Sequence, residues 1–199
     1  MKKIHEIIIG TNNAGKYKEI SSLLPPRIKK YCPKQLNICS PEENGKTFEQ
    51  NSQLKALYYS KKTNLVCLAD DSGLEIELLN GNPGINSARW GGPKSDFNLA
   101  IKKVFKEMKK VKKNWEIKNT ARFVCSLTLC WSSGKNFSST GIVKGRILNT
   151  KKGNNGFGYD PIFVPNGLDQ TFGELDPEIK LSIDHRFVAF SKIKTFFTD

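Results

Sequence analysis

The chain has 199 residues, of which 38% are hydrophobic and 26% are charged. This composition is typical of a globular protein with a substantial core, and we expect one domain over residues 1–199. Lysine and arginine outnumber aspartate and glutamate by 32 to 19, so the formal net charge is +13. Such a surface attracts polyanions, but charge alone does not distinguish a nucleotide from a nucleic acid.

Hydropathy and cysteine usage exclude several other classes of protein. No apolar run approaches the roughly 20 residues that a membrane-spanning helix needs, so we expect no membrane partner. Residues 1–10 begin with a charged lead, but their apolar stretch is too short for a secretory leader and contains Glu6. We therefore expect a cytoplasmic protein. The five cysteines form no C-x-x-C pair, which favours reduced, packed thiols over zinc ligation or disulfides.

The first half of the chain alternates apolar stretches of strand or helix periodicity with polar loops. Pro25 and Pro26 end the first predicted helix, because proline lacks the N–H that a helix interior requires. Thr47 is a suitable N-cap for the second, since its hydroxyl can accept a hydrogen bond from an N–H of the first turn. In chain order, the predicted elements are a strand at 4–9, a helix at 16–24, a helix at 47–61, a strand at 65–69 and a short strand at 74–78.

The second half starts with a long Gly/Pro/Asn-rich loop at 80–93, a type of segment that is usually functional or disordered. Residues 101–113 predict a helix with a lysine face, which we interpret as solvated rather than as a nucleic-acid surface. Next come a predicted hairpin with strands at 122–131 and 137–147, a glycine-rich loop at 153–161, a strand at 162–164 and a helix from 184. The predicted apolar helix faces are Ile101, Val104, Phe105, Met108 and Val111, then Phe187, Phe190, Ile193 and Phe197.

Asp70 and Asp71 directly follow the buried strand at 65–69 and precede Ser72 and Gly73. Ligands of parallel α/β sheets bind beyond the carboxyl ends of the strands, so we expect the chemistry at this junction. Adjacent strand residues point to opposite faces, which predicts different roles for the two aspartates. Neighbouring carboxylates repel each other, and a divalent cation would remove that cost.

Residues 10–16 nearly spell a phosphate-binding P-loop, in which a Ser or Thr that holds magnesium follows the lysine. Tyr17 occupies that position and cannot replace the short hydroxyl, which argues against a P-loop NTPase. Backbone N–H groups at a helix N-terminus, with Lys16 beside them, still suit a phosphate. The alternative is an Asn/Gly turn beside a solvated lysine.

Three other segments carry candidate site residues, each with a structural alternative. Glu43 precedes the second helix, where an acid either binds metal or complements the helix dipole. The glycines of 153–161 let backbone approach a ligand, or they form a tight turn whose aromatic residues fill the core. His185 and Arg186 at a helix start offer donors for a base edge or a phosphate, or are exposed polar groups of a first turn.

Several collinear motifs together carry a resemblance to a known family. They are Thr11-x-Asn13-x-x-Lys16, Glu43, Thr47-Phe48-Glu49-x-Asn51, Lys55-Ala56, Ala69-Asp70-Asp71-Ser72-Gly73-Leu74, Pro83-Gly84-Ile85-x-Ser87-Ala88-Arg89, Gly156-Phe157-Gly158-Tyr159-Asp160-Pro161-Ile162-Phe163, Lys180 and His185-Arg186. In this order, over nearly the whole chain, they closely resemble the inosine triphosphate pyrophosphatase family. Members of that family hydrolyse deaminated purine nucleoside triphosphates.

The resemblance implies an α/β fold, with an elongated mixed β-sheet and flanking helices that form two lobes around a central nucleotide-binding cleft. It implies a single pyrophosphatase domain, commonly a homodimer, with no specific nucleic-acid partner. In the implied reaction, water attacks the α-phosphorus of ITP, dITP or XTP and releases pyrophosphate and the monophosphate, which sanitises the nucleotide pool. The implied cofactor is Mg²⁺, with Mn²⁺ as a substitute.

The resemblance also implies roles for residues of this sequence. Asp71 would be the general base and, with Glu43, a metal ligand, while Asp70 would support the site from behind through nearby backbone. The implied substrate-binding residues are Thr11, Asn12, Asn13, Ala14, Gly15, Lys16 and Lys55 at the triphosphate, Ser72, and Phe157, Gly158, Tyr159, Asp160, Lys180, His185 and Arg186 around the base.

Base selectivity has a chemical basis and one visible departure from the family. Hypoxanthine and xanthine carry an acceptor at C6 where adenine carries an amino donor, so donors near His185 and Arg186 would favour them. Guanine shares the C6 oxygen and is not excluded by this argument. Asp184 replaces the serine that the family usually has before the His-Arg pair, which places an extra anion near the expected base.

Overall fold

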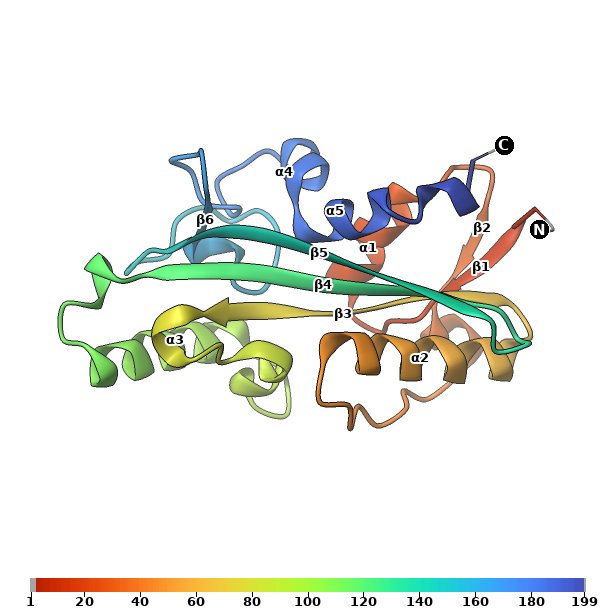
Figure 1. The fold of residues 1–199 in the computed structure, drawn as a ribbon, viewed down its shortest axis with the longest axis horizontal. Helices are drawn as coiled ribbons and strands as arrows, with labels where there is room; N and C mark the ends of the chain where they lie inside the picture. The colour runs from red at the N-terminus through yellow and green to blue at the C-terminus, as the bar shows by residue number, and fades with distance from the viewer. Residues whose placement is uncertain (1–2, 199) are drawn as a thin grey trace. The chain divides into compact units, whose positions relative to one another are not determined.

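A mixed β-sheet of six strands, in the order β2-β1-β3-β4-β5-β6, organises residues 3–198, which are the residues that the computed structural model describes (Figure 1). The strands are β1 (Glu6–Ile9), β2 (Lys29–Tyr31), β3 (Val66–Ile76), β4 (Thr120–Cys130), β5 (Asn136–Ile147) and β6 (Phe163–Pro165). β1 pairs in parallel with β2 and β3, whereas β5 and β6 are antiparallel. The helices are α1 (Ala14–Leu23), α2 (Phe48–Thr63), α3 (Phe97–Val111), α4 (Pro177–Ile183) and α5 (His185–Ser191).

The described residues divide into two compact units, which we treat separately. Unit 1 comprises residues 3–71, 125–141 and 186–198. Unit 2 comprises residues 72–124 and 142–185. No helix within 3–198 is long and apolar enough to cross a membrane.

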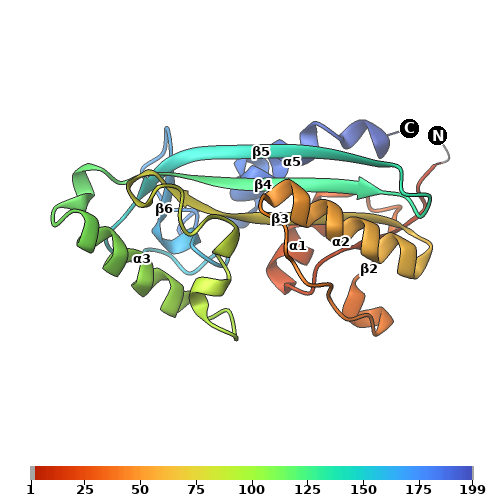
Figure 2. The ribbon, with the colours of Figure 1, turned by 60° about the horizontal axis from the view of Figure 1, so that its bottom comes forward.

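The alternating side chains of the strands give unit 1 two apolar layers. Ile7 and Ile9 of β1 and Leu68 of β3 belong to a buried cluster that α1 and α5 cover. Ile8 and Cys67 point the other way, into a cluster with Ala56 and Tyr59 of α2, which Figure 2 shows running alongside β3. Both faces of these strands are therefore buried, which explains their nearly continuous apolar sequence.

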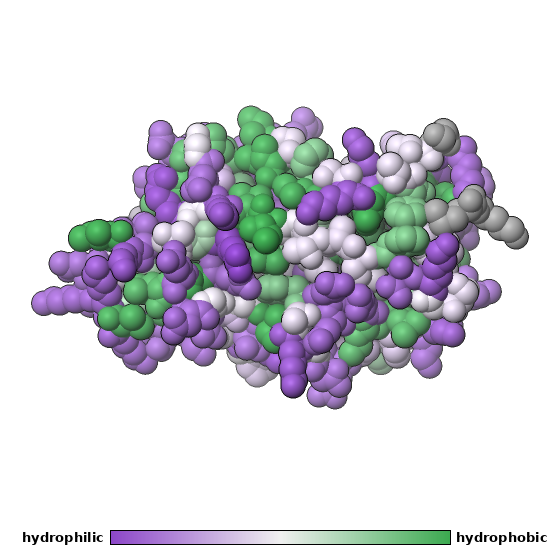
Figure 3. All heavy atoms as spheres, in the orientation of Figure 1, coloured by the Kyte–Doolittle hydropathy of each residue, from purple (hydrophilic) through white to green (hydrophobic). Residues whose placement is uncertain are grey.

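Unit 2 has its own core, built on the second half of β3 and on α3. Leu74 and Ile76 pack in one cluster with Ile101, Val104 and Met108. The lysines of α3 lie on its opposite, exposed side, as predicted, and Figure 3 shows hydrophilic side chains over this helix, interrupted by small apolar patches. The prediction for Val111 was wrong: it is 60% exposed, because it is the last residue of α3 and lies beyond the core.

β3 is one strand of 11 residues, although the sequence predicted two strands separated by 70–73. Aspartate and glycine have low β-propensity, but tertiary contacts override a preference of this size. The parallel pairing of β1 with β3 ends at Ile9 and Leu68. Asp70 and Asp71 therefore lie inside a strand, just beyond the carboxyl end of the neighbouring strand β1.

The C-terminal helix is also shorter than predicted, since α5 ends at Ser191 and only a 3₁₀ turn at Lys194–Phe196 follows. The buried residues of this C-terminal segment include Arg186, Ala189, Phe190 and Ile193, whereas Phe187 is 39% exposed. The prediction placed Phe187 on the apolar face of this helix together with Phe190, Ile193 and Phe197. Arg186 is buried instead, because two carboxylates bind its guanidinium.

Most of the other predicted elements are confirmed, with shifts of a few residues at their ends. Residues 77–79 form a 3₁₀ turn where the sequence predicted the end of a strand. The structure adds β2 and α4, which the sequence did not predict. Cys67, Cys125 and Cys130 are buried, as predicted for packed thiols, whereas Cys39 is exposed.

Candidate functional site

The predicted site residues form two groups, one in each unit. The unit 1 group contains Thr11, Asn12, Asn13, Ala14, Gly15, Lys16, Glu43, Lys55, Asp71 and Arg186. The unit 2 group contains Ser72, Phe157, Gly158, Tyr159, Asp160, Lys180 and His185. Each group is described by the contacts within its own unit.

Asp70 and Asp71 are both almost fully buried, with 0% and 5% of their surface exposed. Asp70 lies on the same face of β3 as Leu68, where α1 and α5 pack. Asp71 lies on the opposite face, toward α2, where Cys67 and Ala69 pack. The strand therefore gives the two carboxylates different surroundings, as their adjacency predicted.

Asp71 is held by two side chains from one face of α2. Asn51 donates a hydrogen bond from Nδ2 to Asp71 Oδ2 at 3.0 Å. Lys55, four residues further along the helix and so on the same face, places Nζ 3.9 Å from Asp71 Oδ1. Burial raises the pKa of Asp71, and Glu43 adds to that rise, while Lys16, Lys55 and the Asn51 hydrogen bond oppose it.

Lys55 is the cation that Glu43 and Asp71 share. Its Nζ lies 2.8 Å from Glu43 Oε1, and its side chain is only 7% exposed. Burial lowers the pKa of Lys55, but Asp71, Asp70 and Glu43 together outweigh burial, so the net pKa is raised and the ammonium stays charged. Carboxylates from two separate segments, the loop before α2 and β3, thus converge on one cationic centre.

Asp70 binds cations from two helices. Lys16 Nζ lies 3.2 Å and Arg186 Nη2 3.3 Å from Asp70 Oδ2. Arg186 also donates from Nη1 to Glu19 Oε2 at 2.8 Å. The sequence analysis placed Arg186 at the base and gave Glu19 no role, although Glu19 lies three residues after Lys16 and hence on the same face of α1. The partners of Asp70 include these charged side chains rather than only the backbone that we expected.

The loop before α1 is organised as a helix N-terminus, as the sequence predicted. Asn13 caps the helix, since its Oδ1 accepts from the backbone N–H of Lys16 at 3.0 Å. The hydroxyl of Thr11 accepts from the N–H of Asn13 at 3.2 Å. Asn12 donates from Nδ2 to Ser40 Oγ at 2.8 Å, and α1 begins with Ala14 and Gly15. Lys16 thus lies in the first turn of a capped helix whose N-terminal end favours anions.

The unit 2 group centres on a buried ion pair. Lys180 Nζ lies 2.6 Å from Asp160 Oδ2, and both side chains are less than 5% exposed. The same carboxylate oxygen accepts from the N–H of Phe157 at 2.8 Å. Lys180 also lies over the ring of Phe157, 5.2 Å from its centroid. Gly156 has a φ of +72°, and a Cβ there would collide with Asp160, so this turn requires glycine.

The aromatic residues of this group are divided between surface and core. Tyr159 is 2% exposed and donates its hydroxyl to Ser87 O at 2.9 Å. For this residue the structure matches the alternative in which 153–161 is a tight turn whose aromatic residues fill the core. Burial raises the pKa of Tyr159, so it stays neutral. His185 stacks on Phe123 with ring centroids 4.7 Å apart. Gly158 and Phe157 line a cavity of about 220 Å³, and Ser72 is half-buried at the start of the unit.

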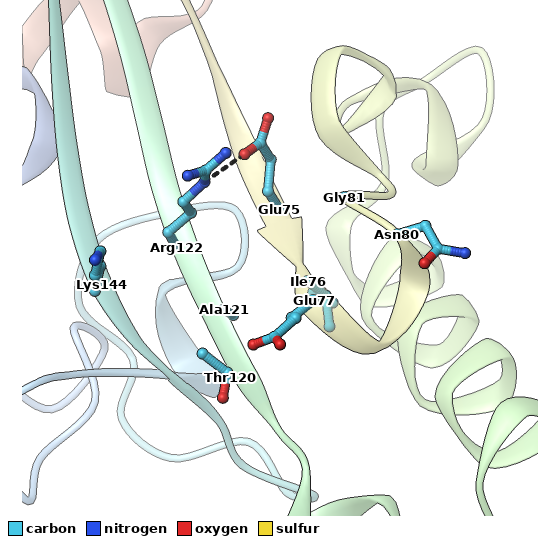
Figure 4. Close-up of a pocket in the computed structure, with 9 residues that line it drawn as sticks. All are labelled: Glu75, Ile76, Glu77, Asn80, Gly81, Thr120, Ala121, Arg122 and Lys144. Carbon is cyan, nitrogen blue, oxygen red and sulfur yellow. Dashed lines mark hydrogen bonds and ion pairs between the residues drawn. The ribbon is translucent and has the colours of Figure 1, made fainter.

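A second cavity in unit 2, of about 460 Å³, contains none of the predicted site residues (Figure 4). Its charged lining comprises Glu75, Glu77, Arg122 and Lys144. Arg122 of β4 donates from Nε to Glu75 Oε2 of β3 at 2.6 Å. Acids and bases balance in this lining, so it provides no net field for an anionic or a cationic ligand.

The carboxylates of unit 1 suit one kind of metal ion better than others. Within 3–198 there is no group of three or more His, Cys, Asp or Glu residues that could hold a metal. A closed zinc site needs four such ligands, whereas Mg²⁺ uses one or two carboxylates and takes its other ligands from water and substrate phosphates. Glu43 and Asp71, which converge on the same ammonium, match the magnesium pattern.

Comparison with known proteins identifies relatives along nearly the whole chain. The model of the Ham1 family matches residues 7–196. A dITP/XTP pyrophosphatase from Caulobacter vibrioides is 41% identical over 194 residues, which cover 98% of both chains. One from Zymomonas mobilis is 40% identical over 188 residues, covering 94% of this chain and 89% of its own. A solved HAM1 protein structure from Coxiella burnetii has a TM-score of 0.85 at 34% identity, covering 96% and 98%. The predicted α/β fold is confirmed.

The different surroundings of the two aspartates predict opposite effects on stability. Because the pKa of Asp71 is raised on folding, its ionisation lowers the free energy of unfolding as pH rises above its unfolded value of about 3.9. At pH 7, Asp71→Asn should therefore not lower that free energy. Asp70→Asn deprives the cationic Lys16 and Arg186 of a buried partner and should lower it by about 3 kcal/mol. Urea unfolding measures both values, and equal losses would contradict the assignment.

Proposed function

Because the chain belongs to the Ham1 family, we propose that it is a nucleoside triphosphate pyrophosphatase that hydrolyses the deaminated purine nucleotides dITP, XTP and ITP. The observation that carries this proposal is the convergence of Glu43 and Asp71 on Lys55. These residues share unit 1 with the capped helix start that holds Lys16. Carboxylates for a metal ion and cations for phosphates are the two requirements of pyrophosphate release.

The triphosphate would be bound by the positive groups of unit 1. Lys16 and the N-terminal end of α1 present an ammonium and backbone N–H groups to an anion. Lys55 adds a second ammonium, which its carboxylate neighbours keep protonated. In the transition state, negative charge grows on the departing pyrophosphate, and preorganised cations stabilise it more than they stabilise the ground state.

Glu43 and Asp71 would hold a Mg²⁺ ion, or Mn²⁺ as its substitute. Both are oxygen ligands of the kind that these hard cations prefer, and their present arrangement already accommodates one positive charge. When bound, such an ion neutralises phosphate charge and polarises the phosphoryl group.

Asp71 would act as the general base. Its raised pKa makes it a better proton acceptor than an exposed aspartate. As water attacks the α-phosphorus, its oxygen forms a new bond to phosphorus and its proton passes to Asp71. The bond from the α-phosphorus to the bridging oxygen breaks, and that oxygen leaves with the pyrophosphate. Asn51 donates a hydrogen bond to this carboxylate.

Recognition of the base would fall to the unit 2 group. Lys180 and His185 offer donors, and Phe157 offers a ring that contacts Lys180. A donor directed at the C6 oxygen of hypoxanthine or xanthine would be left without an acceptor by the amino group of adenine. Asp160 limits the freedom of Lys180 by pairing with it, which fixes the direction of this donor.

Assembly and location follow from the family resemblance. The proposal is a homodimer that acts in the cytoplasm, without a nucleic-acid partner. Light scattering of the purified protein would give the mass of the assembly, and a monomer at micromolar concentration would contradict the dimer.

Three predictions test this function, and the first concerns the product. With Mg²⁺, the protein should convert dITP, ITP and XTP to the monophosphate and pyrophosphate with a kcat/KM at least about tenfold above that for dATP, because adenine lacks the C6 acceptor. Chromatography of the nucleotide and an enzymatic pyrophosphate assay measure the two products. Release of orthophosphate and a diphosphate would contradict the pyrophosphatase assignment.

The second prediction concerns the base. Asp71→Asn should lower kcat for dITP by roughly 10² to 10⁴, the usual contribution of a positioned general base, while the protein stays folded. The matched control is Asp169→Asn, which makes the same change at a fully exposed carboxylate in unit 2. Wild-type turnover in Asp71→Asn would refute its role.

The third prediction concerns the metal. Glu43→Gln should raise the Mg²⁺ concentration for half-maximal activity by at least about tenfold, because it removes one of two carboxylate ligands. Glu42→Gln changes the adjacent, exposed acid and should leave this concentration unchanged. A titration of activity against free Mg²⁺ gives both values, and identical shifts in the two variants would rule out Glu43 as a ligand.

A further inference from the structure

Asn51 is buried in α2, with 2% of its surface exposed, and its side-chain amide joins two separate parts of unit 1. Its Nδ2 donates to Asp71 Oδ2 at 3.0 Å. Its Oδ1 accepts from the backbone N–H of Gly45 at 2.8 Å. Gly45 lies two residues after Glu43, in the loop that precedes α2. One amide group thus contacts the proposed base and the loop of the proposed metal ligand.

The loop approaches Asn51 closely enough that only glycine fits at position 45. A Cβ on Gly45 would lie 2.6 Å from Asn51 Oδ1 and 2.8 Å from Gln50 Cβ. The next residue is fixed separately, since Lys46 donates its N–H to Gln50 Oε1 at 2.7 Å. The loop is therefore tied to the first turn of α2 at two successive amides. Of the two side chains that bind these loop amides, Asn51 is the one that also binds Asp71.

Asn51 and Lys55 each link Asp71 to the loop that precedes α2. Lys55 lies one helical turn after Asn51 and contacts Glu43 at 2.8 Å and Asp71 at 3.9 Å. Asn51 contacts Gly45 and Asp71. The contacts close a ring that runs from Asp71 through Asn51 to the loop, along the loop to Glu43, and through Lys55 back to Asp71.

The Asn51 link is neutral and directional, whereas the Lys55 link is ionic. A carboxamide has both a donor and an acceptor at its end, so asparagine can bind a carboxylate and an N–H at once. Aspartate would keep the acceptor for Gly45 but lose the donor for Asp71. Leucine has nearly the same size and would lose both. If a substrate phosphate or a cation drew Lys55 away, Asn51 would still hold the loop to Asp71.

We propose that Asn51 is a positioning residue that holds the carboxylate of Asp71 and the Glu43 loop in fixed register. This inference rests on the proposed function for its effect on turnover. The anchoring of the loop rests on geometry alone and has a readout of its own.

The kinetic test compares Asn51→Leu and Asn51→Asp with the wild type, using dITP and Mg²⁺. Both variants should lose roughly 10- to 100-fold in kcat, as is usual when a group that orients a ligand is removed, with a smaller change in KM. Gln53→Leu is the matched control, because it replaces another amide of α2 that bonds only to Glu49 and Ser138. It should keep wild-type kcat.

The structural test measures hydrogen exchange at the Gly45 amide by NMR, without nucleotide or metal. Exchange should be faster in Asn51→Leu, which lacks the acceptor, and close to wild type in Asn51→Asp, which keeps it. Asn51→Asp should therefore combine a protected loop with a low kcat. A general loss of structure would instead change both measurements together.

Several outcomes separate this inference from the proposed function. Wild-type kcat in a folded Asn51→Leu variant overturns the inference, and so does an equal loss in Gln53→Leu. Unchanged exchange at Gly45 in Asn51→Leu overturns the anchoring. If Asn51→Leu does not fold, the kcat of Asn51→Asp decides the kinetic part. Gly45→Ala then decides the anchoring, because it displaces the loop from Asn51 and should make amide exchange at position 45 faster. If the wild type releases no pyrophosphate from dITP, the proposed function fails while the exchange test still stands.

Discussion

The alternation of side chains along β3 is the constraint on which the rest of unit 1 depends. The parallel pairing with β1 ends at Leu68, and the next polar residues of β3 are Asp70 and Asp71. Because β3 continues as a strand, these two carboxylates are held on opposite faces of the sheet. Each face is covered by a different set of helices, so Arg186 of α5 binds Asp70, whereas Asn51 of α2 binds Asp71. Outside a strand, the alternation of side chains would not hold the two carboxylates on opposite faces.

Burying two adjacent carboxylates is costly unless each is paired and hydrogen-bonded. On one face, Asp70 is compensated by Lys16 and Arg186, and Arg186 is compensated further by Glu19. On the other face, Lys55 is shared by Asp71 and Glu43. The first arrangement is deeply buried. The second keeps a partly exposed member, since 34% of the Glu43 side chain is accessible. The Glu43 side is therefore the one that solvent, and hence a hydrated cation, can reach.

Local signals were sufficient for most of the longer helices and strands, but not for the long-range partners of the site residues. Thr47 caps α2 and Asn13 caps α1 because capping depends on residues within one turn. The short strand β2 and the seven-residue helix α4 carry too few residues for a periodic signal. Glu19 and Asn51 bind Arg186 and Asp71, which lie 167 and 20 residues away, so no spacing rule could find these pairs. The buried face of α5 was predicted incorrectly because the carboxylates that bind Arg186 also lie far away in the sequence.

The contrast between the two aspartates also supports the proposal that Asp71, rather than Asp70, acts as the base. A carboxylate that a protein holds only by strong cationic contacts is stabilised as an anion and is a weak base. Burial raises the pKa of Asp71, although Lys16 and Lys55 oppose that rise, and Lys55 lies 3.9 Å from Asp71 while Glu43 binds it more closely. Its environment therefore favours proton uptake, and its folded-state ionisation costs stability. Asp70, with cations from two helices on one oxygen, joins β3 to α1 and α5. Asp70 thus secures the strand, and the proposed base, Asp71, is held beside it in a less favourable ionised state.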